Sequence, residues 1–343
     1  MPLVRVSAPS PDWWAWLPRQ SPGGSGTWGD FAFAPADDPA CAQPDYWVVL
    51  DGLPSRESAR VPSERVVFVT CEPQSLRSYQ PAFLAQFGHV VTSQERIVGP
   101  NVVHSQTALM WHAGVRRRRG EGGAQLERDV HVLGYDDLRA TRLEKTRDIS
   151  VVCSAKSQSD GHALRLSFVE QLKEHFGDRL DWFGKGIRPI EDKWEALAPY
   201  RFHISLENTA ERDYWTEKLA DAYLGCAFPF YWGCTNLGEY FEDEAFRKID
   251  PARPHWSIEV METVIAEGIT AERLDAVERA RALVLDRYNF FPAVTSFLGC
   301  CADGRRQAVR LRPEAEFLPR APLWHRTAAR AKRAFLKRTR SVT

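Results

Sequence analysis

Polar and charged side chains gather between two apolar runs in the second half of the sequence. Asn208 follows the run 202–206, and Tyr214, Glu217 and Lys218 open an amphipathic stretch. Carboxylate and amide oxygens accept hydrogen bonds from hydroxyls, whereas an ammonium group binds anions. If the stretch is a helix, Lys218 lies in its first turn, where the helix dipole disfavours a cation. A bound diphosphate would resolve this conflict, with Lys218 and the free N–H groups of the helix on the anion and Glu217 on a hydroxyl; the other interpretation is a solvated Glu–Lys pair on a surface helix.

The residues around this cluster predict the elements that hold it. The run 202–206 is typical of a buried strand and 207–213 of a loop, and apolar residues at i, i+4, i+7 and i+8 from Trp215 predict a helix. Gly225 suits the end of that helix, and 227–232 predicts another buried strand. Such a short strand–helix–strand unit predicts two neighbouring parallel strands. Ligands of parallel sheets bind at the carboxyl ends of the strands, where the cluster is expected to lie.

The spacing of these residues resembles the donor-site signature of the α-1,3-fucosyltransferase family, glycosyltransferase family 10, of the bacterial type. The signature reads Glu-Asn-Thr, then Asp-Tyr-x-Thr-Glu-Lys, then Pro-Phe-Tyr-Trp-Gly, here at 207–209, 213–218 and 229–233. The resemblance extends over about 46–291 and is densest over 149–233. It implies an inverting glycosyltransferase that moves fucose, or a close sugar, from GDP-fucose to a hydroxyl of a glycan acceptor, for example in cell-surface polysaccharide or lipopolysaccharide synthesis.

Two residues outside the signature fit the same chemistry. Glu72 comes directly after the apolar run 66–70, so a parallel sheet would place it at the carboxyl edge. The family has its catalytic base in this context, whereas the structural interpretation is a surface glutamate. Arg165 is expected in the first turn of a helix over 163–176, as a second cation for a diphosphate, and the family also has an arginine there.

The resemblance also suggests roles for the remaining site residues. Glu217 and Asn208 are expected to hold hydroxyls of the sugar or ribose, and Tyr214 to stack on the donor or form a hydrogen bond with it. No Asp-x-Asp sequence occurs. We therefore expect neither a divalent metal nor any other cofactor, because cationic side chains would neutralise the diphosphate.

Alternating apolar runs and amphipathic stretches predict an α/β fold with two Rossmann-like domains facing each other across a cleft, the GT-B type. The predicted strands are 46–50, 66–70, 89–92, 149–153, 180–183, 202–206 and 227–232, and the predicted helices include 76–87, 163–176, 193–200, 256–266 and 271–288. The expected domains are an acceptor-side domain at 1–148 with a Trp-rich N-terminal segment, a donor-binding domain at 149–291, a connecting segment at 292–321 and a basic tail at 322–343.

Composition and charge exclude some functions. The 45 basic and 45 acidic residues cancel, so no global field attracts nucleic acid. Four arginines at 116–119 suit a solvated loop, and no nucleic-acid-binding motif accompanies them. Seven scattered cysteines without a Cys-x-x-Cys pair indicate free thiols in a reducing compartment. Without a signal peptide, a long apolar run or an Asn-x-Ser/Thr site, the cytoplasm is the expected compartment.

The two ends of the sequence have their own character. Trp16 and Trp28 flank Arg19, an arrangement that suits sugar binding, although tryptophans that cap the core of the first domain are the other interpretation. The tail 322–343 is amphipathic and basic with no acidic residue, which predicts contact with an anionic membrane surface from the cytoplasmic side. A frayed tail, or a helix that docks on a partner, fits the same pattern.

Three other functions fit these observations. They are a transferase of the same fold with another nucleotide sugar, a non-catalytic glycan-binding relative that uses the tryptophans, and a nucleic-acid or membrane adaptor that uses the arginine runs. The sequence also departs from the family. Cys71 stands where a small residue is common, and Met-Trp-His-Ala at 110–113 matches no known motif.

Overall fold

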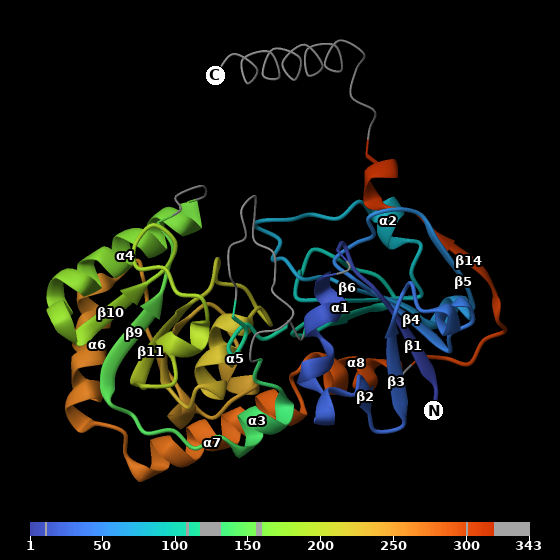
Figure 1. Cartoon of the computed structure of the whole chain (residues 1–343). Helices are drawn as coiled ribbons and strands as arrows, with labels where there is room; N and C mark the ends of the chain where they lie inside the picture. Colours follow the sequence, from blue (N-terminus) through green and yellow to red (C-terminus); the bar gives the residue numbers. More distant parts are fainter. Residues whose placement is uncertain (11, 108–109, 117–131, 156–159, 300, 319–343) are drawn as a thin grey trace, which may run out of the picture.

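The computed structural model describes residues 1–10, 12–107, 110–116, 132–155, 160–299 and 301–318. Two sheets divide these residues into two lobes that lie side by side (Figure 1). The first lobe is built on seven strands and the second lobe on five. A cavity between the lobes is lined by residues of both. The predicted α/β class, with two Rossmann-like domains facing each other across a cleft, is confirmed.

The sheet of the first lobe has the strand order β2-β3-β1-β4-β6-β7-β8. All its neighbouring strands are parallel except β2 and β3. The strands are β1 (Leu3–Ser7), β2 (Thr27–Trp28), β3 (Phe31–Pro35), β4 (Tyr46–Leu50), β6 (Val66–Val69), β7 (His89–Thr92) and β8 (Val102–His104). Beside them β5 (Glu57–Val61) pairs antiparallel with β14 (Gln307–Leu311).

The strand β1 is absent from the predicted strands because Arg5 interrupts its apolar run. In the fold it is an interior strand between β3 and β4. The Arg5 guanidinium is buried, lies 2.6 Å from the Glu57 carboxylate and stacks 4.6 Å from the ring centroid of Trp47. A buried cation is tolerated here because it is paired and packed.

The sheet of the second lobe is entirely parallel, in the order β10-β9-β11-β12-β13. Its strands are β9 (Arg147–Val152), β10 (Leu180–Phe183), β11 (Tyr200–Leu206), β12 (Phe228–Trp232) and β13 (Arg247–Lys248). Its helices are α3 (Tyr135–Ala140), α4 (Asp160–Phe176), α5 (Glu217–Leu224), α6 (Pro254–Glu267) and α7 (Ala271–Asp286), with α4 packed on α6 and α5 on α7. The chain runs from β11 through α5 to its parallel neighbour β12, which confirms the predicted strand–helix–strand unit.

Two predicted helices are wrong in extent. The helix expected at 76–87 is only α2 (Pro81–Leu84), because Pro81 forces Gln80 into an extended conformation with ψ of 128°. The helix expected at 193–200 is the single 3₁₀ turn η6 (Lys193–Ala196), and β11 begins at Tyr200. The remaining helical segments are α1 (Asp12–Trp16), η1 (Pro18–Gln20), η2 (Pro22–Gly24), η3 (Pro39–Ala42), η4 (Ser63–Arg65), η5 (Gly177–Arg179), η7 (Leu237–Glu239), η8 (Asp243–Ala245) and η9 (Glu314–Glu316).

The end of the described chain returns to the first lobe (Figure 1). Helix α8 (Phe290–Leu298) buries Phe290 and Phe291 in the core of that lobe, and β14 then pairs with β5. The described part of the expected connecting segment 292–321 is therefore an integral part of the first lobe. Conversely, α3, which falls within the expected first domain 1–148, packs its residues Tyr135 and Leu138 into the core of the second lobe.

Several sequence predictions concern small features of the fold. Of the two tryptophans that flank Arg19 in the sequence, Trp28 packs against the cores of both lobes, whereas Trp16 lines the cavity between the lobes. The six described cysteines are free thiols. Within the described ranges, no helix is long and apolar enough to cross a membrane. Most of the arginine run at 116–119 and the whole tail 322–343 lie outside the described residues.

Candidate active site

The carboxyl ends of β9, β10 and β11 open onto a cavity of about 270 Å³, called here the sheet-edge cavity. Residues directly after each strand line it, among them Ser154, Lys185 and Asn208. Gly184 has a φ of +149°, and a Cβ atom there would collide with the backbone carbonyl of Cys153. Only glycine allows the end of β10 to approach β9 this closely.

The sheet-edge cavity has an excess of positive charge. Its lining contains two carboxylates, those of Glu217 and Asp221, and four cationic side chains, those of Arg165, Lys185, Lys193 and Lys218. Four positive against two negative charges leave an excess of two. Such a cavity suits an anion with two or more negative charges, and guanidinium and ammonium groups are the usual ligands of phosphate oxygens.

Arg165 reaches this cavity from the second turn of α4, one turn later than predicted, because the helix already begins at Asp160. Its Nη1 donates a hydrogen bond to the backbone carbonyl of Leu206, at 3.2 Å. Its Nε–H is buried and has no hydrogen-bond partner among the described residues. The guanidinium is therefore anchored at one nitrogen and still has donors to offer.

Helix α5 begins at Glu217, with Thr216 as its N-cap, so Trp215 precedes the helix rather than opening it. The ammonium of Lys218 lies 3.3 Å from the Glu207 carboxylate and 3.5 Å from that of Glu217. Burial opposes its charge, but the two carboxylates outweigh that effect and raise the pKa of Lys218 above its usual value. Protein carboxylates thus offset the unfavourable helix dipole, and one N–H of the first turn, that of Lys218, is bonded to the Thr216 hydroxyl.

Glu207 contacts parts of the signature that lie before and after helix α5. It is fully buried, and its two oxygens accept hydrogen bonds from the backbone N–H and the hydroxyl of Thr216, both at 2.8 Å. Gly233, the last residue of the signature, has a φ of +152°, and a Cβ atom there would collide with the Glu207 side chain. Glu207 and Gly233 therefore fix the beginning of α5 against the end of β12.

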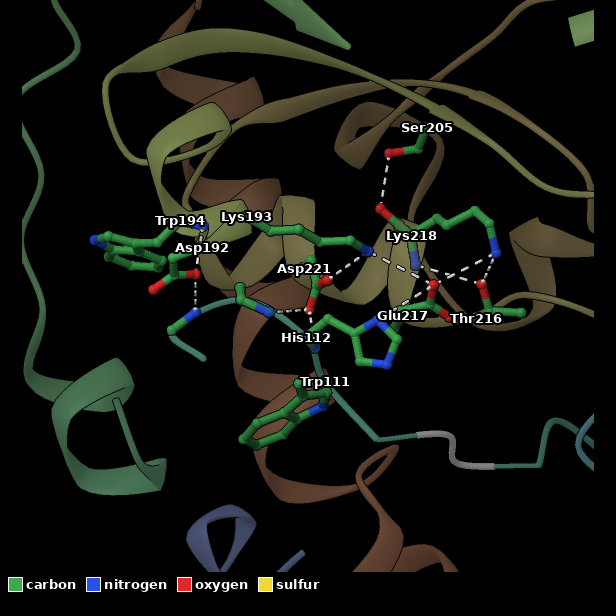
Figure 2. Close-up of polar contacts among 12 residues, drawn as sticks. Trp111, His112, Asp192, Lys193, Trp194, Ser205, Thr216, Glu217, Lys218 and Asp221 are labelled. Carbon is green, nitrogen blue, oxygen red and sulfur yellow. Dashed lines mark hydrogen bonds and ion pairs between the residues drawn. The ribbon is translucent and has the colours of Figure 1, made fainter. Parts of the chain in front are cut away.

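Glu217 lies at the centre of three cationic or ionisable nitrogens (Figure 2). Its Oε1 is 3.5 Å from Nζ of Lys218, 3.6 Å from Nζ of Lys193 and 3.8 Å from Nδ1 of His112. Burial alone would raise the pKa of this carboxyl, but Lys218, Lys193 and His112 together hold the pKa well below its usual range. Glu217 is therefore an ionised hydrogen-bond acceptor rather than a proton carrier.

A second cavity, of about 570 Å³, lies between the lobes and is called here the interlobe cavity. The second lobe contributes Asn208, Tyr214, Thr216, Glu217 and Lys218 to its lining, and the first lobe contributes Ser10, Asp12, Trp13, Trp16, Asp51, Cys71 and Glu72. The two cavities share His112, Asn208, Glu217 and Lys218, so they adjoin. Glu72 thus faces the same space as Lys218 and Glu217, from the opposite lobe.

The two acids on the first-lobe side of the interlobe cavity differ in their partners. Asp51 accepts hydrogen bonds from the guanidinium of Arg77 and the hydroxyl of Tyr79, each at 2.5 Å. The Glu72 carboxylate has no hydrogen bond or ion pair with any described residue. Burial first, and then the nearby Asp51, raise the pKa of Glu72, while the charge of Lys218 opposes them. An unpaired carboxyl with a raised pKa is suited to accept a proton.

The structure brings the predicted site residues together around these two cavities. Arg165, Asn208, Glu217 and Lys218 line the sheet-edge cavity, whereas Tyr214, which is 3% exposed, lines only the interlobe cavity. The Asn208 amide makes no hydrogen bond within the described part of the chain. Arg19, which Trp16 and Trp28 flank in the sequence, donates hydrogen bonds to the backbone carbonyls of Leu133 and Trp111.

Sequence reasoning missed several residues of this site. Lys185 carries a usable signal, because it follows the predicted strand 180–183 and so lies at the carboxyl edge. Lys193, Asp221 and His112 carry no such signal. The first lies in a 3₁₀ turn, the second on a helix face that any buried residue could occupy, and the third in the segment between the lobes.

Two comparisons with known proteins find matches within part of the chain. Residues 144–253 match the model described as glycosyltransferase family 10 (fucosyltransferase) C-term. A stretch of 57 residues is 37% identical to alpha-(1,3)-fucosyltransferase FucT of Helicobacter pylori, and it spans 17% of this chain but only 12% of that relative. These two matches confirm the family resemblance for the second lobe.

Solved structures resemble the chain over a greater length. A crystal structure of an alpha1,3-fucosyltransferase with GDP aligns with 89% of this chain and 91% of its own, at 16% identity and a TM-score of 0.46. A glycosyltransferase from Rickettsia africae ESF-5 aligns with 87% of this chain and 96% of its own, at 10% identity and a TM-score of 0.45.

Proposed function

We propose that this chain, whose second lobe carries a fucosyltransferase domain of glycosyltransferase family 10, is an inverting glycosyltransferase that moves fucose, or a close sugar, from GDP-fucose to a hydroxyl of a glycan acceptor. One observation carries the proposal. An unpaired carboxylate with a raised pKa, Glu72, faces a cavity that adjoins another with four cations against two carboxylates. The first group suits proton abstraction, and the second suits a diphosphate leaving group.

The donor would bind with its diphosphate in the sheet-edge cavity. When the bond between the sugar and the phosphate breaks, the bonding electrons leave with GDP, which gains negative charge. Arg165 and Lys218, with Lys185 and Lys193 beside them, would stabilise that charge as it develops. We propose that these side chains do this without a divalent metal or another cofactor.

The acceptor would bind in the interlobe cavity with a hydroxyl near Glu72. As its oxygen forms a bond to the anomeric carbon, the hydroxyl proton passes to Glu72. Glu72 and the cationic cavity belong to opposite lobes, so the attack would come from the side opposite the departing diphosphate and invert the anomeric centre. General-base help of this kind contributes about 10²–10⁴ in rate.

The other predicted residues would hold the donor. Glu217 is ionised and accepts hydrogen bonds, and the Asn208 amide has both donors and acceptors to offer, so the two would hold hydroxyls of the sugar or ribose. Tyr214 lines the interlobe cavity and would contact the donor sugar there. Burial raises the pKa of its phenol, which keeps it a neutral hydrogen-bond donor.

A second candidate function is favoured by Trp13 and Trp16, which line the interlobe cavity beside Glu72. Tryptophan faces bind sugar rings, so the cavity would also suit a glycan-binding relative without turnover. The sugar of the donor is equally open to variation, because the charge of the sheet-edge cavity selects the diphosphate rather than the sugar. A transferase with another nucleotide sugar is thus the nearest alternative.

Turnover separates these candidates. The pure protein is incubated with a panel of GDP-sugars and glycan acceptors, and released GDP is measured. The proposal predicts GDP release from GDP-fucose or a close GDP-sugar that depends on the acceptor. GDP binding with no turnover of any donor would instead support the glycan-binding relative, and release from a different class of nucleotide sugar would contradict the donor assignment.

We also propose that the basic tail at 322–343, outside the described residues, holds the enzyme on an anionic membrane surface on the cytoplasmic side. Its cations without any acid support this interpretation. Flotation with anionic liposomes, for the full chain and for a chain that ends at residue 321, tests it. Equal binding of the two proteins would end this part of the proposal.

A further inference from the structure

The segment that joins the lobes, 111–114, is fixed to the second lobe by a buried aspartate. The backbone N–H groups of His112 and Ala113 both donate to Oδ1 of Asp221, each at 3.0 Å (Figure 2). The other oxygen, Oδ2, accepts a hydrogen bond from Lys193 at 3.1 Å. A buried carboxylate with three donors, one of them charged, is a strong anchor.

The residues on either side of His112 are anchored as well. Trp111 lies in the core of the second lobe, and its backbone N–H donates to the side chain of Gln20 at 2.9 Å. Gly114 donates its N–H to Oδ1 of Asp192, also at 2.9 Å. The backbone on both sides of His112 is therefore fixed, and with it the direction of the Cα–Cβ bond of this residue.

The imidazole of His112 lies where the two cavities meet. It lines both of them, its side chain is 34% exposed, and its Nδ1 is 3.8 Å from Oε1 of Glu217. Glu217 and Asp221 are four residues apart on α5, so the same helix face holds the ring of His112 through one residue and its backbone through the other. The segment 110–113, which matched no sequence motif, thus delivers a titratable group to the site.

The two cavities that His112 lines also contain acidic and basic side chains, and one further histidine, from both lobes. From the second lobe they are Arg165, Lys185, Lys193, His203, Glu217, Lys218 and Asp221, and from the first lobe Asp12, Asp51 and Glu72. Burial lowers the pKa of His203 to about 3, so this residue is neutral. Glu217 places a carboxylate oxygen 3.8 Å from Nδ1 of His112.

We propose that His112 is a further donor-binding residue, whose imidazolium adds a positive charge at the junction of the two cavities and holds the diphosphate of the GDP-sugar. The inference rests on the proposed function. Protonation raises the cations that line the sheet-edge cavity from four to five, against the same two carboxylates. An imidazole carries a positive charge only when it is protonated, so the contribution of this charge to binding is lost as the pH rises.

Calorimetric GDP binding, compared between wild type and His112→Gln at a series of pH values, tests the inference. GDP itself titrates in this range, but its titration cancels in the ratio of the two Kd values. We expect the variant to bind about tenfold more weakly at about pH 6, with the ratio falling below about threefold at about pH 8.5. His112→Arg, which is always charged, should bind GDP with no such loss at high pH.

A surface histidine provides the matched control. His175 on α4 also pairs with a glutamate, at 3.0 Å from Glu262, but it lines neither cavity. His175→Gln is expected to leave the Kd ratio at one throughout, and melting temperatures show whether each variant is folded. If His112→Gln does not fold, His112→Asn takes its place.

Three results would overturn the inference. A ratio of one at every pH means that the ring does not meet the ligand, and a raised but constant ratio means that its charge plays no part. A wild type that binds no GDP at any pH overturns the inference together with the proposed function, and this result is distinct from the other two.

Discussion

The two lobes present the same chemical group to one cleft in opposite states. In the second lobe, Glu207 and Glu217 each lie within 4 Å of a lysine ammonium. In the first lobe, Asp51 is held by Arg77, but Glu72 has no partner among the described residues. Glu217, which lies beside two lysines, has a lowered pKa and stays charged, whereas the unpaired Glu72 has a raised pKa and is suited to exchange a proton. Burial raises the pKa of Glu207 as well, but its oxygens are taken up by Thr216 and Lys218, so its role is to hold its neighbours.

Glu72→Gln removes the unpaired carboxylate of the first lobe, and of the variants considered it has the largest expected effect. The amide cannot accept the acceptor proton, so we expect kcat to fall by about 10²–10⁴. The Kd for GDP should change by less than about twofold, because Glu72 is not part of the sheet-edge cavity. Glu95→Gln, at an exposed position of the same lobe, is the control. A variant that loses GDP binding along with turnover would show that Glu72 belongs to the donor site instead.

Lys218→Met removes the ammonium group that pairs with Glu207 and Glu217 in the second lobe. Loss of a charged ligand of the diphosphate is expected to weaken GDP binding by about 10–100-fold. It also leaves the buried Glu207 without its cation, which costs about 3 kcal/mol of the free energy of unfolding. Calorimetry and chemical denaturation measure the two effects, with Lys248→Met, at an exposed position on β13, as the control. If GDP bound as tightly to a folded Lys218→Met as to wild type, the lysine would be a purely structural residue.

The pH dependence of turnover distinguishes Glu72 from Glu217 without a mutation. Glu72 must be deprotonated to act, and its pKa is raised, so kcat/KM should fall as the pH drops through a midpoint above the value of about 4.3 for an ordinary glutamate. Glu217, whose pKa is held low, should contribute no such limb in that range. A profile that stays flat down to the ordinary glutamate pKa would contradict the assignment of Glu72 as the base.

Trp16→Ala removes an aromatic side chain from the lining of the interlobe cavity and has the smallest expected effect. If an acceptor ring packs on this side chain, KM for the acceptor rises by about 2–10-fold while the Kd for GDP stays unchanged. An unchanged acceptor KM would leave Trp16 as a wall of the cavity with no part in binding.

The two lobes also differ in how much of their secondary structure could be predicted from the sequence. The strands 46–50, 89–92 and 180–183 have the predicted bounds, because each is a short run rich in β-branched or aromatic residues with polar residues or glycine on both sides. The strand β1 could not be predicted, because the acid that neutralises Arg5 comes from β5, some 50 residues later. The return of α8 and β14 to the first lobe likewise depends on contacts between distant segments.

The residues of the candidate site likewise fall into those that could be predicted from the sequence and those that could not. Asn208, Glu217 and Lys218 could be predicted, because local spacing places them after a strand and at the beginning of a helix. His112 and Lys193 could not, because their positions depend on the path of a crossing segment and on the orientation of a single 3₁₀ turn. Residues that build a strand edge are visible in a sequence, and residues brought there by tertiary packing are not.

In the proposed mechanism, the cations at the carboxyl edge of the second sheet hold the diphosphate of the donor. A crystal structure of the chain with GDP measures this directly. We expect phosphate oxygens within hydrogen-bonding distance of both Lys218 and Arg165, inside the cavity at the ends of β9, β10 and β11. Phosphates bound elsewhere, with Lys218 still paired only to Glu207 and Glu217, would contradict it.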